Sequence, residues 1–226
     1  MNALVSFFQK HGAEMLQRTL EHIYLTFLAM VIAITIALPL GVYLTRSRWP
    51  KFASAVLGAA GVIQTVPSLA LVAFIVLIFA VMALPTIGAL PALVALVLYA
   101  LLPILRNTFT GIRQVDPAVI EVATGMGMKR HQILFSVELP LALPVIMAGI
   151  RISTVWTIGI ATLCGLIGAG GLGDLIIKCH KSLQMDYLLA DTAPAAALAL
   201  LFDWILSRLE KWLSPGAMRS ETDSGT

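Results

Sequence analysis

The chain has 226 residues, of which 59% are hydrophobic and only 12% charged, and its formal net charge is +3. About a quarter of the residues of a typical soluble domain are charged, so this composition argues against an ordinary soluble protein. The Lys and Arg residues flank apolar runs and form no basic run of their own, which argues against nucleic acid as a partner. We therefore expect an all-α integral membrane protein whose surroundings are a lipid bilayer.

The first apolar run follows a short segment of mixed charge, residues 1–21, and predicts a span over about 22–45. Ile23 to Leu44 contains no Asp, Glu, Lys or Arg. A helix needs about 20 apolar residues to cross a bilayer, so this run is long enough. It is too long for the apolar region of a signal peptide and lacks a small-residue cleavage site, so we expect it to be retained.

The next uncharged stretch, Phe52 to Leu105, is long enough for two spans. We place them at about 53–82 and 86–106, with Pro85 and Gly88 marking the turn between them.

A polar cluster interrupts the first of these two spans. Its residues are Gln64, Thr65, Pro67 and Ser68. Proline removes a backbone donor and clashes with the preceding turn, so the helix should be kinked or broken there. One interpretation is a simple loop between two shorter helices. The other is a broken helix that lines a transport pathway, since irregular backbone at membrane depth must face protein or water.

A polar insert follows the third span, and we expect two short helices within residues 116–137. Asp116 is a good N-cap and Pro117 suits the first helical position. Gly125 and Gly127 tolerate the positive φ of a tight turn after a helix. A second short helix, His131 to Val137, should then end where Leu139 and Pro140 turn the chain into the fourth span. An ordinary loop on the same side of the membrane is the alternative.

The last two spans are expected at about 139–167 and 187–207. Arg151 lies deep in the first of them, and a charge at that depth faces protein or water. It is either a structural tie to another helix or a pathway residue; the neighbouring Gly149 and Ser153 indicate a close helix contact and favour the tie. The glycine-rich run 168–173 formally fits a dinucleotide fingerprint, but no βαβ unit surrounds it. An outer turn, or a close approach between subunits, explains it better.

The distribution of Lys and Arg predicts the orientation of these five spans, because cytoplasmic loops are enriched in both. One set of connections and the C-terminal tail hold most of them: Arg46, Arg48, Lys51, Arg106, Arg113, Lys129, Arg130, Arg208, Lys211 and Arg219. The alternate set holds Lys10, Arg18, Lys178 and Lys181. We therefore expect an outer N-terminal segment at 1–21, a membrane-spanning domain at 22–209 and a polar cytoplasmic tail at 210–226.

The sequence shows no arrangement of residues that is typical of a metal site, a nucleotide site or an enzyme active site. Cys164 and Cys179 have no metal-binding spacing and read as packing thiols, and the four histidines lie too far apart to suggest a metal site. The sequence lacks a Gly-x-x-x-x-Gly-Lys-Ser/Thr phosphate loop and any nucleophile–base arrangement. We expect neither an enzyme nor a bound cofactor.

The insert resembles the cytoplasmic "EAA" loop of permease subunits in binding-protein-dependent ABC importers. That loop reads Glu-Ala-Ala, three residues, Gly, nine residues, Ile, one residue, Leu-Pro. The matching positions here are Glu121, Val122, Ala123, Gly127, Val137, Leu139 and Pro140, with Val in place of the first Ala and of the Ile. Residues 64–70 and 168–174 are similar to stretches in permeases of the osmoprotectant group, which import glycine betaine, carnitine or choline.

The resemblance implies a type I importer permease like the methionine permeases, in the bacterial cytoplasmic membrane. Its partners would be a cytoplasmic ATPase dimer, an extracytoplasmic substrate-binding protein and a second, identical or homologous permease subunit. Glu121, Val122, Ala123, Gly125, Gly127, Leu139 and Pro140 would then couple the spans to the ATPase. Gln64, Thr65, Pro67, Ser68 and Arg151 are the candidates for the pathway.

Two other functions also fit the sequence. Permeases for methionine, phosphonate or taurine share much of the pattern. An ion-coupled secondary transporter would use the break at Pro67 and Arg151 as its site, although five spans without an internal repeat argue against it.

Overall fold

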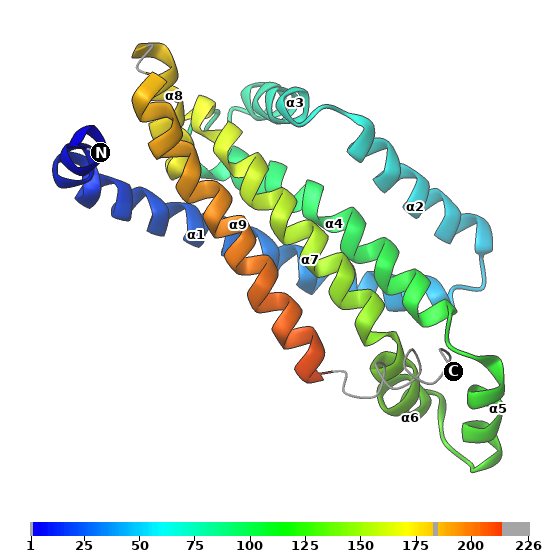
Figure 1. Cartoon of the computed structure of the whole chain (residues 1–226). Helices are drawn as coiled ribbons and strands as arrows, with labels where there is room; N and C mark the ends of the chain where they lie inside the picture. The colour runs from blue at the N-terminus through cyan, green and yellow to red at the C-terminus, as the bar shows by residue number, and fades with distance from the viewer. Residues whose placement is uncertain (1, 183–184, 214–226) are drawn as a thin grey trace.

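The computed structural model describes residues 2–182 and 185–213, and every regular element in these ranges is helical (Figure 1). The helices are, in chain order, α1 (Asn2–Arg46), α2 (Pro50–Thr65), α3 (Ser68–Val81), α4 (Ala89–Arg113), α5 (Pro117–Gly125), α6 (Arg130–Ile133), the π-helical η1 (Leu134–Glu138), α7 (Leu139–Leu163), the 3-10 helical η2 (Cys164–Ile167), α8 (Leu172–Ser182) and α9 (Met185–Leu213). Residues 214–226, most of the expected tail, lie outside the described residues.

Helix α4 is the centre of the bundle, with α1 and α7 packed against it. Small residues let the backbones approach closely, as is usual between membrane helices. A Cβ on Gly41 of α1 would lie 2.7 Å from Thr108 Cγ2, and a Cβ on Gly149 of α7 would lie 2.8 Å from the carbonyl oxygen of Pro103. Ser153 adds a hydrogen bond to the carbonyl of Ala100, 2.9 Å long. The close contact expected around Gly149 and Ser153 is therefore confirmed.

Four helices of the described residues are long and apolar enough to cross a membrane, and α2 with α3 forms a fifth span if the bent pair is counted as one. The five-span expectation is confirmed in this form. The two halves meet at an angle of 105° around Val66 and Pro67. The interruption expected at Pro67 is thus a sharp break. Tyr99 of α4 donates its hydroxyl to the carbonyl of Val66, which replaces a bond that the helix loses there.

The N-terminal segment is not separate from the first span. Residues 2–46 form one helix of 45 residues, so the expected N-terminal segment and the first span share one continuous helix. Side-chain pairs one turn apart support its N-terminal part: Arg18 Nη1 lies 2.9 Å from Glu21 Oε2, and Gln17 donates to Glu21 over 3.1 Å.

The second short helix expected in the insert is not separate from the fourth span either. Helical residues run without a break from Arg130 to Ile167. Leu139 and Pro140 do not turn the chain, as the sequence suggested, but begin α7. Before them the helix widens into a π turn, in which the Leu139 N–H bonds to the carbonyl of Leu134. A π turn accommodates a proline that has no N–H of its own to give.

The glycine-rich run, residues 168–173, packs closely against another part of the same chain. Gly168, Gly170 and Gly171 have positive φ, and the Gly171 N–H donates to Glu21 Oε2 over 3.1 Å. This contact ties the run to α1. The sequence predicted an outer turn at this place but missed α8, the helix that follows it.

Gly173 at the start of α8 provides a sharp test of this packing. A Cβ there would lie 2.1 Å from the carbonyl oxygen of Thr162, whereas a Cβ on Gly159 of α7 would meet nothing within 4 Å. We expect Gly173→Ala to destabilise the purified protein by about 1–3 kcal/mol or more, because backbone must shift. The matched Gly159→Ala should be neutral or stabilising by up to about 1 kcal/mol. Equal thermal unfolding midpoints of the two variants would refute this packing.

Candidate coupling segment and transport pathway

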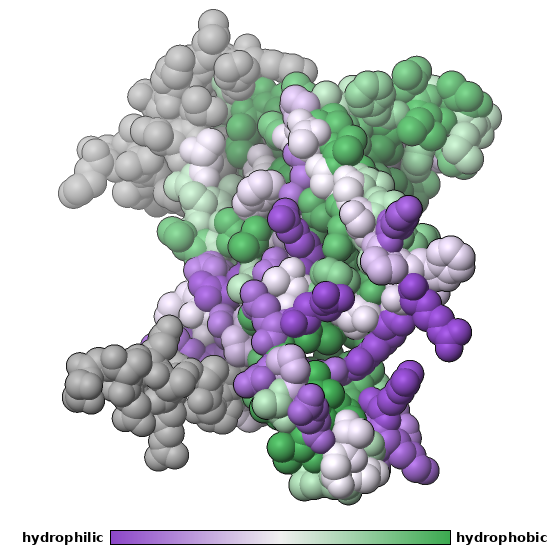
Figure 2. All heavy atoms as spheres, turned by 90° about the vertical axis from the view of Figure 1, so that its right-hand side faces the viewer, coloured by the Kyte–Doolittle hydropathy of each residue, from purple (hydrophilic) through white to green (hydrophobic). Residues whose placement is uncertain are grey.

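One end of the bundle carries α5 and α6, and the other carries α8 and the start of α1 (Figure 1). Figure 2 shows hydrophilic side chains gathered on the lower half of the face that carries α2 and α5, with a mainly hydrophobic surface above. At the α8 end, the cations Arg18 and Lys178 are paired with carboxylates: Arg18 with Glu21 and Asp174, and Lys178 with Glu14. The uneven distribution of Lys and Arg along the sequence is thus also a difference between the α5 end and the α8 end of the bundle.

Helix α5 begins as the sequence predicted. The carboxylate of Asp116 accepts a hydrogen bond from the Ala118 N–H at 2.9 Å, and Pro117 occupies the first helical turn. An N-cap of this kind stabilises a helix by about 1 kcal/mol, which matters in a helix of only nine residues.

The turn after α5 depends on one glycine. Gly127 has a φ of 79°, and the following Met128 N–H bonds to the carbonyl of Ala123 at 3.2 Å. This closes the end of the helix in the manner of a C-terminal cap. Gly125 was expected to share this role, but it is the last residue of α5 and does not have a positive φ.

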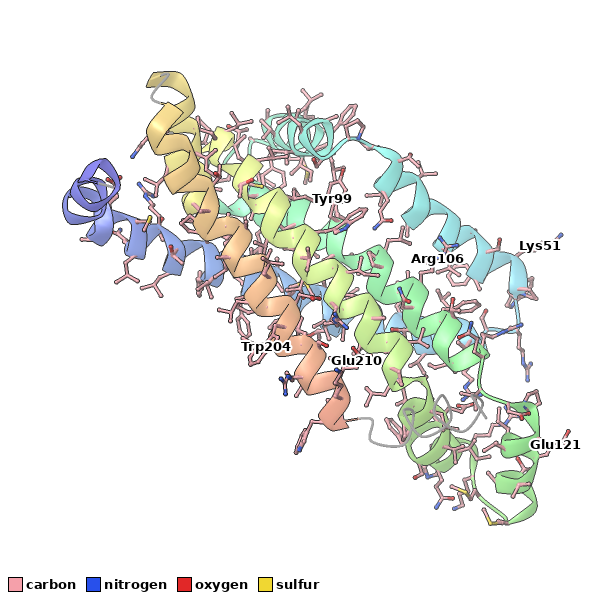
Figure 3. The ribbon with its side chains drawn as sticks, in the orientation of Figure 1. Lys51, Tyr99, Arg106, Glu121, Trp204 and Glu210 are labelled. Carbon is pink, nitrogen blue, oxygen red and sulfur yellow. The ribbon has the colours of Figure 1, made fainter. Side chains whose placement is uncertain are left out.

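Some of the expected coupling residues are exposed to solvent, and others are buried against the bundle. Glu121 and Val122 are exposed, and Val122 is 63% exposed. Figure 3 shows Glu121 on α5 pointing away from the bundle. Ala123 is buried, while Leu139 packs against the core around Ile112. Gly125, Gly127 and Pro140 are exposed like Glu121 and Val122, so these five are open to contact with a partner protein.

Two apolar side chains of the insert were missed. Met126 is 70% exposed and Phe135 is 68% exposed. Lys129 and Arg130 lie exposed between them in the chain. Large apolar side chains in an otherwise polar insert were the available sequence signal for this feature.

A second missed feature connects the insert to the first span. Glu138, which is 2% exposed, accepts a hydrogen bond and ion pair from Arg46 at the end of α1. A buried carboxylate requires such a partner. Since Glu138 lies in the continuous helix from α6 to α7, the pair links that helix to α1 at the coupling end. A lone Glu between apolar residues was the sequence signal.

Four of the five candidate pathway residues lie together. Gln64, Thr65, Pro67 and Ser68 line one cavity of about 390 Å³, with Val66 between them. Its other walls come from α4 and α7 and were not expected: Tyr99, Trp156, Gly159, Ile160 and Leu163. Figure 3 shows Tyr99 on α4 beside the break between α2 and α3.

Arg151, the fifth candidate, does not line this cavity. Its guanidinium donates to both carboxylate oxygens of Asp203, at 3.0 and 3.2 Å, and to Glu210 at 3.1 Å. These contacts tie α7 to α9 and fit the structural alternative. Arg151 and Asp203 also line a neighbouring cavity of about 460 Å³ between the two helices, and Trp156 lines both this cavity and the one at the break.

A larger cleft of about 690 Å³ lies between the end of α1, α2 and α4. Arg106 and Arg113 line it from α4, and none of the pathway candidates does. In the described part of the chain, no group of three or more His, Cys, Asp or Glu residues is placed to hold a metal ion.

A broken second span, a long oblique first helix and a capped helical insert at the end rich in cations together define a class of membrane permease. The chain belongs to the family of binding-protein-dependent transport system inner membrane components, which it matches over residues 37–217. The resemblance seen in the insert is thereby confirmed.

Individual relatives are similar over the whole chain. The carnitine transport permease protein OpuCB of Listeria monocytogenes is 46% identical over 225 residues, which covers 100% of both chains. The glycine betaine/carnitine/choline transport system permease protein OpuCB of Bacillus subtilis (strain 168) is 43% identical and covers 97% of each.

The fold also has a counterpart among solved structures. A chain of the inward-facing MetNI methionine ABC transporter superposes with a TM-score of 0.75, covering 88% of this chain and 96% of that one at 23% identity. The expected methionine-permease-like fold is confirmed.

Proposed function

We propose that this chain is the membrane subunit of an ATP-driven importer and forms the pathway for a small osmoprotectant such as glycine betaine, carnitine or choline. The observation that carries the substrate class is the 46% identity over the whole chain to a carnitine transport permease. The coupling function is supported by the exposed face of α5 and by the unbroken helix that runs from α6 into α7.

The proposed arrangement puts the α5 end in the cytoplasm and the N-terminus outside, in a bacterial cytoplasmic membrane. The excess of Lys and Arg at the α5 end supports this orientation. A cytoplasmic ATPase dimer would bind α5, and a substrate-binding protein would dock at the end that carries α8. A second permease subunit would complete the pore. This chain would bind no cofactor, and the ATPase would use the ATP.

Two connections between the insert and the spans would transmit the motion of the ATPase. When ATP closes the ATPase dimer, a force on α5 and α6 reaches α7 through the continuous helix and α1 through the Arg46–Glu138 pair. Helices that move as rigid bodies between two packings give alternating access. The pathway candidates Gln64, Thr65, Pro67 and Ser68 lie at the break between α2 and α3, where a change of angle would open or close the cavity.

Growth under osmotic stress tests this function. The permease would be expressed with its ATPase and binding protein in a bacterium that lacks its own osmoprotectant importers. We expect growth at high salt to be restored by micromolar glycine betaine, carnitine or choline. Rescue by none of them, together with uptake of methionine, taurine or a phosphonate, would contradict the proposed substrate class.

A further inference from the structure

The cavity at the break between α2 and α3 has two walls of different chemistry. Its volume of about 390 Å³ is within the usual range of small-molecule sites. One wall is aromatic and comes from α4 and α7, and the other is polar and comes from the broken span.

Trp156 supplies the aromatic wall. It lies in the C-terminal half of α7 and is 50% exposed, and its exposed surface lines both this cavity and the neighbouring one beside Arg151. Gly159 lies one turn further on the same helix and also lines the cavity. None of the described residues lies within 4 Å of the position that a Cβ on Gly159 would take, so the space beside Trp156 is open.

An indole face attracts a cation. Trp is the strongest of the aromatic residues in this respect, and quaternary ammonium groups are typical ligands of such faces. A trimethylammonium group suits this wall better than an ammonium that has N–H donors, because it can be bound without hydrogen bonds.

The polar wall carries unused hydrogen-bond donors. Gln64 lines this wall, and its side-chain nitrogen Nε2 is buried without a hydrogen-bond partner among the described residues. A buried donor without a partner is costly, so a ligand acceptor would relieve it.

The start of α3 adds further donors. The first N–H groups of a helix have no carbonyl one turn back to bond. Pro67 stands at the N-cap position and provides no side-chain cap for them. This end of a helix also carries the positive end of its dipole. Both features favour a carboxylate beside Ser68.

We propose that this cavity is a transient binding site for a zwitterion that carries a trimethylammonium and a carboxylate. Trp156 binds the trimethylammonium, and Gln64 with the first N–H groups of α3 binds the carboxylate. The site rests on the proposed function and adds to it the residues that select the substrate within the membrane subunit.

Two substrates that differ at one end provide the test. Glycine betaine has both groups, whereas choline has the trimethylammonium and a hydroxyl. Uptake of each would be measured in proteoliposomes of the complete importer with the unaltered binding protein at saturating concentration, so that changes in rate reflect the permease.

Gln64→Leu should lower the uptake rate of glycine betaine about 10-fold while changing that of choline much less, because only the carboxylate loses a donor. Gln64→Asn keeps the amide and is the matched control. Trp156→Ala should lower both rates by roughly 3- to 30-fold, and Trp156→Tyr should retain most of them. Gly159→Leu should block both by filling the cavity, while Gly159→Ala should not.

The ratio of the two rates separates a binding role from a structural one. Equal losses for both substrates in Gln64→Leu, or unchanged rates in Trp156→Ala, would overturn the site while leaving the importer function intact. If the wild-type importer takes up none of glycine betaine, carnitine and choline, the proposed function fails and the site fails with it.

Discussion

Glu121→Arg should abolish ATP-driven uptake while leaving the protein folded in the membrane. The side chain points away from the bundle, and its removal breaks no contact that supports the described fold. On the partner side, a carboxylate at this position would accept a charge-assisted hydrogen bond from the ATPase, and such bonds are about twice as strong as neutral ones. Reversing the charge replaces an attraction by a repulsion, so we expect uptake to fall at least about 100-fold.

The control for this prediction is Glu121→Gln, which keeps the shape and the acceptor oxygen but removes the charge. It should retain partial uptake. Membrane abundance, the thermal unfolding midpoint and co-purification of the ATPase would be measured for each variant beside uptake. Undiminished uptake by Glu121→Arg would remove Glu121 from the coupling surface, and loss of the protein from the membrane would show a structural role instead.

Arg151→Met should destabilise the permease through the two carboxylates that it leaves behind. Asp203 and Glu210 both depend on this one guanidinium, at distances of 3.0 and 3.1 Å. Breaking a buried ion pair costs about 3–5 kcal/mol, and the partial exposure of all three side chains reduces our expectation to about 2–3 kcal/mol. Unfolding of the purified protein by denaturant in micelles measures this difference.

A triple variant isolates the cause. With Arg151→Met, Asp203→Asn and Glu210→Gln together, the unpaired charges are gone and most of the lost stability should return. Neutral groups of the same size in place of a buried ion network are often tolerated. If Arg151→Met alone is as stable as the wild type, the network contributes nothing, and a pathway role of Arg151 would then regain support.

Local signals in the sequence predicted the parts of the fold that depend on neighbouring residues. Pro67 gave the break in the second span because the effect of proline is confined to its own turn. Asp116 and Gly127 gave the start and end of α5 for the same reason. Long uncharged runs predicted the spans, since hydropathy is a property of each segment by itself.

Contacts between distant residues could not be predicted in this way. Arg46 and Glu138 are separated by 92 positions, and nothing near either of them indicates the other. Trp156 reads as one apolar residue of a span until α7 is placed beside the break in α2 and α3. The continuity of α6 with α7 was missed because Pro140 was taken as a turn, whereas a π turn accommodates it.

Helix α8 was missed for a different reason. Its residues follow a run of glycines and include Asp174 and Lys178, so the stretch read as an outer loop. The glycines serve close packing instead: Gly173 lies against the backbone of Thr162, and Gly171 lies against His22. Only the packed structure distinguishes a glycine that provides a turn from one that provides space.

The central claim is that this membrane subunit moves an osmoprotectant with energy supplied by an ATPase that contacts α5. The most direct test is uptake of radiolabelled glycine betaine, carnitine and choline into proteoliposomes that contain the permease, its ATPase and its binding protein. We predict uptake of at least one of them that requires ATP inside and binding protein outside, and that a proton or sodium gradient cannot replace. Uptake driven by such a gradient without ATP would contradict the account.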